Sequence, residues 1–204
     1  MTNPLLTRHS YRPKPGLAFL EGLSLAQARV HEFCGSARRT LALIAARATE
    51  GPVFWISPGW THERLNAQGV LDFINPGRLT LISPPRGDDL LWVMEEILRS
   101  GCAPLVVCEL PGLPHLTAVR RLHLAAENAA QDRKVSPLGL LLTAGTGGAA
   151  GVESRWHMAP AHIGQRQIWQ LERRRARMEP VADWHVERHG RDFSLVTAPP
   201  PQNC

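Results

Sequence analysis

Five short, largely apolar runs that alternate with helical patterns constrain the fold of this 204-residue chain more than any other feature. Their hydrophobicity suits strands of a parallel sheet that is buried on both faces. The predicted strands are Val30–Cys34, Pro52–Ser57, Leu79–Ser83, Leu105–Leu110 and Leu138–Thr143. The predicted helices are Arg38–Thr49, a short one near His62–Gln68, Asp88–Ser100 and His115–Ala130. Such alternation predicts an α/β fold with a mostly parallel sheet flanked by helices.

The first predicted strand leads into a turn that stands where a nucleotide-binding RecA-type domain carries its phosphate loop. A working loop has Gly, four spacer residues and then Gly-Lys-Ser/Thr, so that backbone amides wrap the phosphates and the lysine reaches the terminal ones. Here Thr40 follows Gly35 too soon, and the second glycine and the lysine are absent. The residues of this degenerate loop are Gly35, Ser36, Arg38, Arg39 and Thr40. The frame of an ATPase is therefore expected without its catalytic loop.

Glu109 ends the fourth predicted strand, where P-loop ATPases hold the Walker B acid that contacts magnesium. Without the lysine loop, this carboxylate has no phosphate–magnesium complex to serve, so we expect a structural or partner-facing role for it. No catalytic residue, cofactor or metal site is predicted. His185 and His189 match no zinc motif, and the alternation around them is typical of a strand.

Residues 17–196 are predicted to form one RecA-like domain, with a core at 28–145 and a C-terminal antiparallel β extension at 154–196. The extension is predicted because tryptophans and aliphatic residues alternate there with polar ones. The proline-rich residues 1–16 are expected to form a flexible arm, and residues 197–204 a disordered tail.

The net charge is +5, and the two ends of the chain are more basic than its middle. Basic ends can meet nucleic acid or an acidic protein partner. The densest basic run, 172–177, is predicted to project guanidinium groups into solvent, where they could grip phosphate or carboxylate. The candidate partner-binding residues are Trp60, Arg120, Arg173, Arg174, Arg175 and Arg177. Trp92 lies on an apolar helix and is expected in the core.

Cysteine usage and hydropathy bear on the compartment. Cys34, Cys102, Cys108 and Cys204 show no metal-ligand spacing and are expected to be core thiols in a reducing compartment. The longest uncharged apolar run, Pro137–Ala144, is far shorter than the roughly 20 residues of a membrane span. We therefore expect a cytoplasmic protein without membrane contact.

Several segments together resemble the ImuA family, which comprises RecA-like accessory proteins of bacterial damage-induced mutagenesis and is distantly related to the SulA cell-division inhibitors. The matching segments, in the family's order, are His31–Ala48, Asp89–Gly101, Leu116–Glu127, Glu153–Trp156 and Trp169–Arg175. The resemblance implies a RecA-like fold without ATPase activity and a cytoplasmic role in translesion DNA synthesis. It implies two partners, an ImuB-like Y-family protein and an error-prone replicative-type polymerase. Direct contact with DNA is left open.

The leading hypothesis is a non-enzymatic adaptor whose sheet lost the phosphate loop and kept its surfaces for protein contacts. The first alternative is a SulA-like inhibitor of the cell-division GTPase. The second is a divergent ATPase that holds phosphate through Arg38, Arg39, Thr40 and the backbone amides of the helix that follows. The extension at 154–196 is expected to carry the partner contact, because tryptophan and arginine dominate interface energies.

Overall fold

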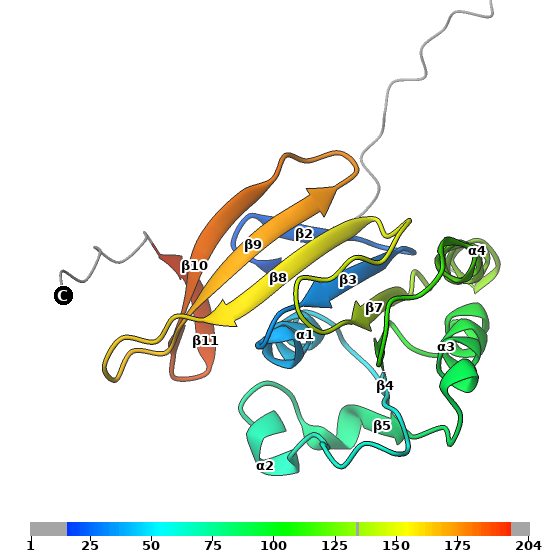
Figure 1. The fold of residues 1–204 in the computed structure, drawn as a ribbon, viewed down its shortest axis with the longest axis horizontal. Helices are drawn as coiled ribbons and strands as arrows, with labels where there is room; N and C mark the ends of the chain where they lie inside the picture. The colour runs from blue at the N-terminus through cyan, green and yellow to red at the C-terminus, as the bar shows by residue number, and fades with distance from the viewer. Residues whose placement is uncertain (1–15, 134, 197–204) are drawn as a thin grey trace, which may run out of the picture.

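The computed structural model describes residues 16–133 and 135–196. Its main feature is a large mixed sheet with helices on both faces (Figure 1). The mutually parallel strands are β3 (Val30–Cys34), β4 (Val53–Ile56), β5 (Leu79–Ile82), β6 (Leu105–Glu109), β7 (Leu138–Leu142) and β8 (Ser154–Pro160). The strands β9 (Ile168–Ala176), β10 (Ala182–His189) and β11 (Asp192–Val196) continue the sheet in antiparallel pairs. The α/β class and the antiparallel C-terminal strands are confirmed.

The nine strands follow the order β11-β10-β9-β8-β3-β7-β6-β4-β5. All five predicted core strands are present within one or two residues of their predicted ends. The extension differs from the predicted antiparallel one in its first strand. Strand β8 pairs parallel to β3 on one side and antiparallel to β9 on the other. The arm predicted at 1–16 and the tail predicted at 197–204 lie outside the described residues, apart from Gly16, which begins the first strand.

Three of the four helices lie within three residues of their predicted ends, whereas the short one predicted near His62–Gln68 begins only at Ala67, because residues 61–66 are not helical. The helices are α1 (Arg38–Arg47), α2 (Ala67–Val70), α3 (Gly87–Ser100) and α4 (Leu116–Arg133), with a 3-10 turn at Pro76–Arg78. Helix α3 ends at Gly101, whose φ of 61° places it in the left-handed conformation that glycine adopts without a steric cost. Asp88 and Asp89 occupy its first turn, where their negative charges interact favourably with the positive end of the helix dipole.

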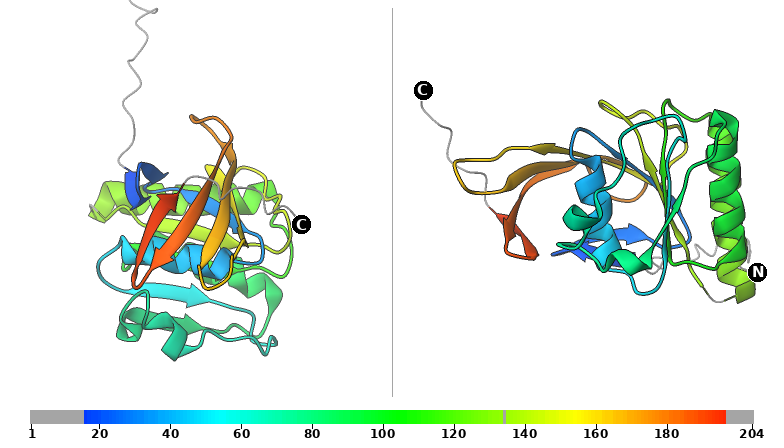
Figure 2. Two further views of the ribbon diagram at one scale, coloured as in Figure 1. Left: turned by 90° about the vertical axis from the view of Figure 1, so that its left-hand side faces the viewer. Right: turned by 90° about the horizontal axis from the view of Figure 1, so that it is seen from below.

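The sheet separates two apolar cores. On one face, α1 and a hairpin of β1 (Gly16–Leu20) and β2 (Leu23–Ala26) pack over Phe33, Trp55 and Trp156. On the other face, α3 and α4 pack through Leu90, Met94, Leu98, Val119 and Leu122. The right-hand view of Figure 2 shows this layering, with α1 and α4 on opposite sides of the sheet. Burial on both faces explains why the core strands carry so little polar surface.

The C-terminal strands curl back over the α1 face. Phe193 of β11 stacks on Phe73 with ring centroids 5.5 Å apart, and Arg47 of α1 forms an ion pair with Asp192 at 3.0 Å. Trp169 is only 7% exposed and lies 6.0 Å from the Phe193 ring. The tryptophans of β8 and β9 therefore belong to the core, and Trp156 and Trp169 offer little surface to a partner.

Trp92 corrects the expectation of a buried side chain, because it is 58% exposed. The buried face of α3 is centred on Leu90, Met94 and Leu98. Trp92 is two residues from both Leu90 and Met94, so it lies about 200° around the helix from each of them, on the solvent side. An apolar helix pattern thus identified the right face but assigned Trp92 to it wrongly.

Cys34 and Cys108 are buried, as expected of core thiols, whereas Cys102 is exposed and Cys204 lies outside the described residues.

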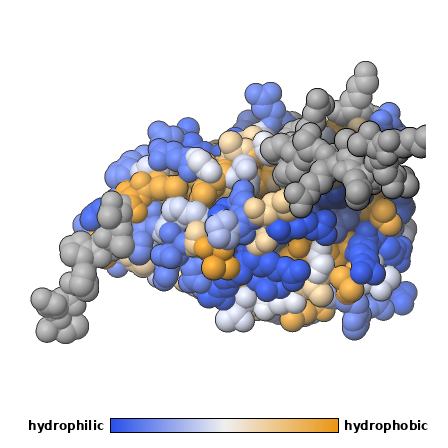
Figure 3. All heavy atoms as spheres, turned by 90° about the horizontal axis from the view of Figure 1, so that it is seen from above, coloured by the Kyte–Doolittle hydropathy of each residue, from blue (hydrophilic) through white to orange (hydrophobic). Residues whose placement is uncertain are grey.

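Within residues 16–133 and 135–196, no helix is both long and apolar enough to span a bilayer. The face of the molecule in Figure 3 is largely hydrophilic, with hydrophobic residues in small groups between polar ones.

Candidate functional site

Two of the five degenerate-loop residues, Arg38 and Arg39, line a hollow at the carboxyl ends of the parallel strands, the edge where α/β sheets bind their ligands. Its volume is about 520 Å³. Segments that follow β3, β4, β6 and β7 contribute its walls, among them Arg38, Arg39, Trp60, Glu63, Glu109 and Leu142. The structure thus brings together the degenerate phosphate loop, the degenerate Walker B position and one predicted aromatic anchor.

The turn at Gly35 is packed against β8. Its φ is +92°, and a Cβ atom added there would lie 2.3 Å from the carbonyl oxygen of Met158. The backbone amide of Ala37 donates to that same carbonyl oxygen at 3.0 Å. A phosphate loop presents such amides to its ligand, whereas this turn uses one of them to join α1 to the neighbouring strand.

Arg38 folds back onto its own turn. Its Nη1 donates to the carbonyl oxygen of Gly35 at 3.2 Å, and its backbone amide donates to the same oxygen at 3.4 Å. Ser36 is exposed and Thr40 is half-buried, and neither side chain forms a hydrogen bond with another described residue. The shortened turn is therefore closed by the arginine that follows it.

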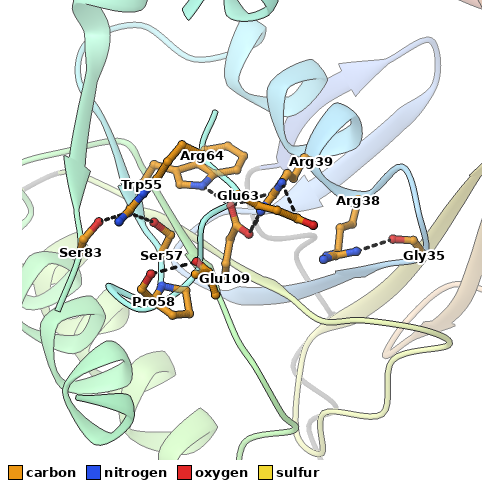
Figure 4. A network of polar contacts seen from close by, with 11 residues as sticks. Gly35, Arg38, Arg39, Trp55, Ser57, Pro58, Glu63, Arg64, Ser83 and Glu109 are labelled. Carbon is orange, nitrogen blue, oxygen red and sulfur yellow. Dashed lines mark hydrogen bonds and ion pairs between the residues drawn. The ribbon is translucent and has the colours of Figure 1, made fainter. Parts of the chain in front are cut away.

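Arg39 and Glu109 form the central contact of the hollow (Figure 4). Arg39 donates from Nε to both carboxylate oxygens of Glu109, at 3.1 and 3.0 Å, and from Nη2 at 2.7 Å. Trp55 donates its indole N–H to the same carboxylate at 2.7 Å, and Glu63 accepts from Arg39 at 3.1 Å. Burial opposes the charge of Arg39, but the hydrogen bonds and charges of Glu109 and Glu63 hold its pKa above the usual value.

Of the two roles expected of Glu109, structural or partner-facing, these contacts support the structural one. The carboxylate is 8% exposed and uses its oxygens to hold one residue from the strand end of β4 and one from the start of α1. Arginine–carboxylate pairs with several parallel N–H bonds are strong and directional. Arg39 of the predicted degenerate loop and Glu109 at the predicted Walker B position are thus joined in an internal ion pair.

Trp60 stands at the rim of the hollow and is 48% exposed, so the predicted exposed aromatic residue is confirmed as exposed. Arg64 fixes its loop, because it donates to Ser57 Oγ at 3.3 Å, to Ser83 Oγ and to the carbonyl oxygen of Gly59 at 3.4 Å. Figure 4 shows Arg64 between the loops that follow β4 and β5. Sequence reasoning missed Arg64 because its contact with Ser83, 19 residues away, depends on β4 and β5 lying side by side.

The arginine run of β9 divides into residues with different roles. Arg173 was predicted to face solvent, yet it is 8% exposed. Its guanidinium carbon lies 5.4 Å from the ring centroid of Trp156 and 5.2 Å from that of Trp184. Arg174 is half-buried and bonds to Glu172 at 2.7 Å. Arg175 and Arg177 are exposed, as predicted.

A β-bulge explains why Arg173 and Arg175 face opposite sides of the sheet. Arg173 pairs with Trp156 and Arg175 pairs with Arg155, so Arg174 is an extra residue in β9. One extra residue shifts the side-chain alternation of everything that follows it. Arg175 and Arg177 consequently reach the α4 side, where they line a second hollow together with Arg120.

A buried carboxylate outside the predicted set holds the loop between β7 and β8. Glu32 is fully buried and accepts from Thr143 Oγ1 at 2.7 Å and from the amide of Gly148 at 2.8 Å. Arg155 pairs with it at 2.5 Å, and these donors hold the pKa of Glu32 below its usual value although burial acts in the opposite direction. A charged residue inside an apolar strand was the sequence signal for such a role.

No group of three or more histidine, cysteine, aspartate or glutamate side chains in the described part of the chain could hold a metal ion. His185 and His189 lie in strand β10, in agreement with the predicted alternation. No protein-family model matches the chain, and neither does any curated protein.

Proposed function

We propose that this protein is a non-catalytic adaptor with a RecA-like fold, similar in role to ImuA proteins. It acts in the cytoplasm in damage-induced translesion DNA synthesis. Its partners are an ImuB-like Y-family protein and an error-prone replicative-type polymerase, and it joins them through protein contacts. The family and the partners in this proposal rest on the sequence resemblance. The absence of catalysis rests on the contacts of Arg39 and Glu109 in the hollow.

Support for the RecA-like fold comes from the place of the degenerate motifs in the sheet. The strand that leads into the shortened loop, β3, is central, and the strand that ends in Glu109, β6, is separated from it by β7 alone. Both motifs end at the same edge of the sheet, which is the arrangement in which a phosphate loop and a Walker B acid could once have shared a ligand.

The observation that carries the non-catalytic role is the Arg39–Glu109 pair. For Glu109 to serve a magnesium ion, it would have to give up the three N–H bonds that Arg39 donates and the one from Trp55. Separating a largely buried ion pair leaves two uncompensated charges and costs several kcal/mol. The side chain of Arg39 is 27% exposed, which lowers this cost somewhat.

Nucleotide titration tests the non-catalytic part of the proposal. We expect no saturable heat when ATP and magnesium are added to the purified protein up to millimolar concentration. Magnesium-dependent binding that the Arg38→Ala and Arg39→Ala variants abolish would instead favour the divergent ATPase. An Arg86→Ala variant, which changes an arginine at the start of α3, serves as the matched control.

Co-precipitation tests the partner assignment. The tagged full-length protein is presented with the ImuB-like protein, the error-prone polymerase and the cell-division GTPase in separate experiments. We expect capture of the first two. Capture of the GTPase alone would transfer the protein to the SulA-like alternative.

A further inference from the structure

A second hollow lies between helix α4, the segment 149–153 and the end of strand β9. Its volume is about 660 Å³, and we call it the α4 groove. Its lining includes Leu116 and Leu124 of α4. We call its exposed arginines, Arg120, Arg175 and Arg177, the rim, and its half-buried residues, Arg29, His123, Glu127 and Glu153, the floor. Three predicted partner-binding residues from distant parts of the sequence therefore meet at one surface.

The rim of the α4 groove carries free positive charge. Arg120, Arg175 and Arg177 are exposed, and within the described part of the chain none of them forms a salt bridge. Arg39, Arg155 and Arg174, by contrast, each pair with a carboxylate. Unpaired guanidinium groups on one rim favour a ligand that brings carboxylates or phosphates.

The floor of the groove contributes no further net attraction. Arg29 pairs with both Glu127 and Glu153, so these three charges largely satisfy one another. His123 accepts from the amide of Val30 at 3.3 Å and lies 3.1 Å from the carbonyl oxygen of Gly151, and burial lowers its pKa. The positive potential of the groove thus arises from its three rim arginines.

Two exposed leucines give the groove an apolar component. Leu116 is 38% exposed and Leu124 is 58% exposed. With Arg120 they occupy positions four residues apart on α4, so they form one stripe along the helix. Leu116 and Leu124 are eight residues apart, or about 12 Å along the axis, with Arg120 midway.

An extended peptide matches this spacing. Residues four apart on an extended chain are separated by about 13 Å and point to the same side, as does the residue between them. A segment with two apolar residues four positions apart and a carboxylate halfway between them would place each side chain against its counterpart on α4. An acidic residue outside the apolar pair would add electrostatic attraction to Arg175 and Arg177.

We infer that the α4 groove binds an acidic, leucine-containing segment of a protein partner. The exposed Leu116 and Leu124 favour a peptide over a nucleic acid, because a peptide brings apolar side chains to cover them and a phosphate backbone does not. The chain's own ends do not fit, since residues 1–15 and 197–204 contain no acidic residue and residues 1–15 are basic. The inference rests on the proposed adaptor function and assigns its partner contact to one surface.

The probe is the peptide acetyl-Asp-Leu-Ser-Glu-Ser-Leu-Asp-amide, titrated into the ¹⁵N-labelled full-length protein. We expect saturable shifts of the backbone amides of 116–127 and 149–153, with no shifts around Trp60. The neutral peptide, in which Asn and Gln replace the acids, should bind at least about tenfold more weakly. Added salt should weaken binding of the acidic peptide more than binding of the neutral one.

Variants separate the groove from a general charge effect. Replacing Arg120, Arg175 and Arg177 together by Glu should weaken peptide binding about tenfold or more, and Leu124→Ser should weaken it without changing the charge. Arg86→Glu, a charge reversal at an exposed arginine that does not line the groove, is the control and should bind like the unaltered protein. Circular dichroism checks that each variant is folded.

Several results would overturn the inference. These are no shifts at millimolar peptide, equal binding of the neutral peptide, and a loss in the Arg86→Glu control as large as in the triple variant. Binding of the oligonucleotide dT20 that the triple variant loses, without peptide binding, would assign the surface to nucleic acid. Peptide binding together with failure of the ImuB-like co-precipitation would remove the proposed function and leave the groove assignment intact.

Discussion

At the scale of single residues, His31 is a buried histidine whose neutral form the fold requires. Its Nδ1 lies 2.6 Å from Ser154 Oγ, and its Nε2 lies 3.0 Å from the carbonyl oxygen of Ala26. Trp156 donates its indole N–H to the same Ser154 hydroxyl at 2.7 Å. Because burial disfavours the charged imidazole, the pKa of His31 falls to about 4 from an ordinary value of 6.5.

This shift predicts a loss of stability in acid. The unfolded chain binds a proton at His31 below about pH 6.5, whereas the folded chain does so only below about pH 4. The contribution is therefore fully present above pH 6.5 and is lost as the pH falls through 4, by about 3 kcal/mol. Urea unfolding of the His31→Gln variant should show a flatter pH dependence between pH 4 and 6.5 than the unaltered protein. Equal slopes in the two proteins would contradict the assignment.

Two tryptophans provide a matched test of burial. Trp55 is 1% exposed and bonded to Glu109, whereas Trp92 is 58% exposed. Trp55→Ala should lower the free energy of unfolding by about 3–5 kcal/mol, because it opens a cavity and removes a donor from a buried carboxylate. Trp92→Ala should change it by less than about 0.5 kcal/mol. Similar losses measured by chemical denaturation would show that the two environments had been assigned wrongly.

At the scale of an element, strand β9 combines a structural arginine with a free one. Arg173 lies beside the stacked rings of Trp156 and Trp184, donates from Nε to the carbonyl oxygen of Pro180 at 2.9 Å and pairs with Glu179. Its aliphatic stem covers apolar surface while its guanidinium group meets two aromatic faces. Arg175, two residues further along, has no such contacts in the described part of the chain.

The bulge at Arg174 therefore predicts effects of different size for substitutions at Arg173 and Arg175. Arg173→Ala should destabilise the protein by about 1–3 kcal/mol, since it removes stacking and leaves Glu179 without its partner. Arg175→Ala should stay within about 0.5 kcal/mol in the same thermal unfolding experiment. If Arg173→Ala left the stability unchanged, Arg173 would face solvent with the rest of the arginine run, as alternation alone predicts.

At the scale of the whole molecule, local patterns predicted elements but not the contacts between distant ones. The apolar runs and the glycine stop signals located the strands and α3, because buried parallel strands and helix ends have local signatures. The Arg39–Glu109 pair joins residues 70 apart, and its bonds become visible only when β3 and β6 end at one edge. The parallel pairing of β8 and the bulge in β9 are properties of sheet register, which a single sequence specifies weakly. For that reason Arg173 was predicted at the surface and Trp92 in the core, whereas the structure buries Arg173 and exposes Trp92.

The continuity of the sheet predicts that the core and the extension unfold together. Strand β8 pairs directly with the central strand β3, and Trp156, Leu171 and Val186 of the extension belong to the same apolar cluster as helix α1. Removing the extension would leave one edge of β3 unpaired and expose the face that these residues cover. The α/β core should therefore not be stable by itself.

Calorimetry of the full chain should accordingly give a single transition, with equal calorimetric and van't Hoff enthalpies, and with coincident changes in tryptophan fluorescence and circular dichroism. At about 0.7 kcal/mol per residue, the enthalpy should be roughly 130 kcal/mol for the described residues. A chain that ends at residue 153 should show no cooperative transition, whereas a chain that ends at residue 196 should melt like the full one. Two resolved transitions, or a cooperative melt of the shorter chain, would mean that the extension is a separate unit attached to a self-sufficient core.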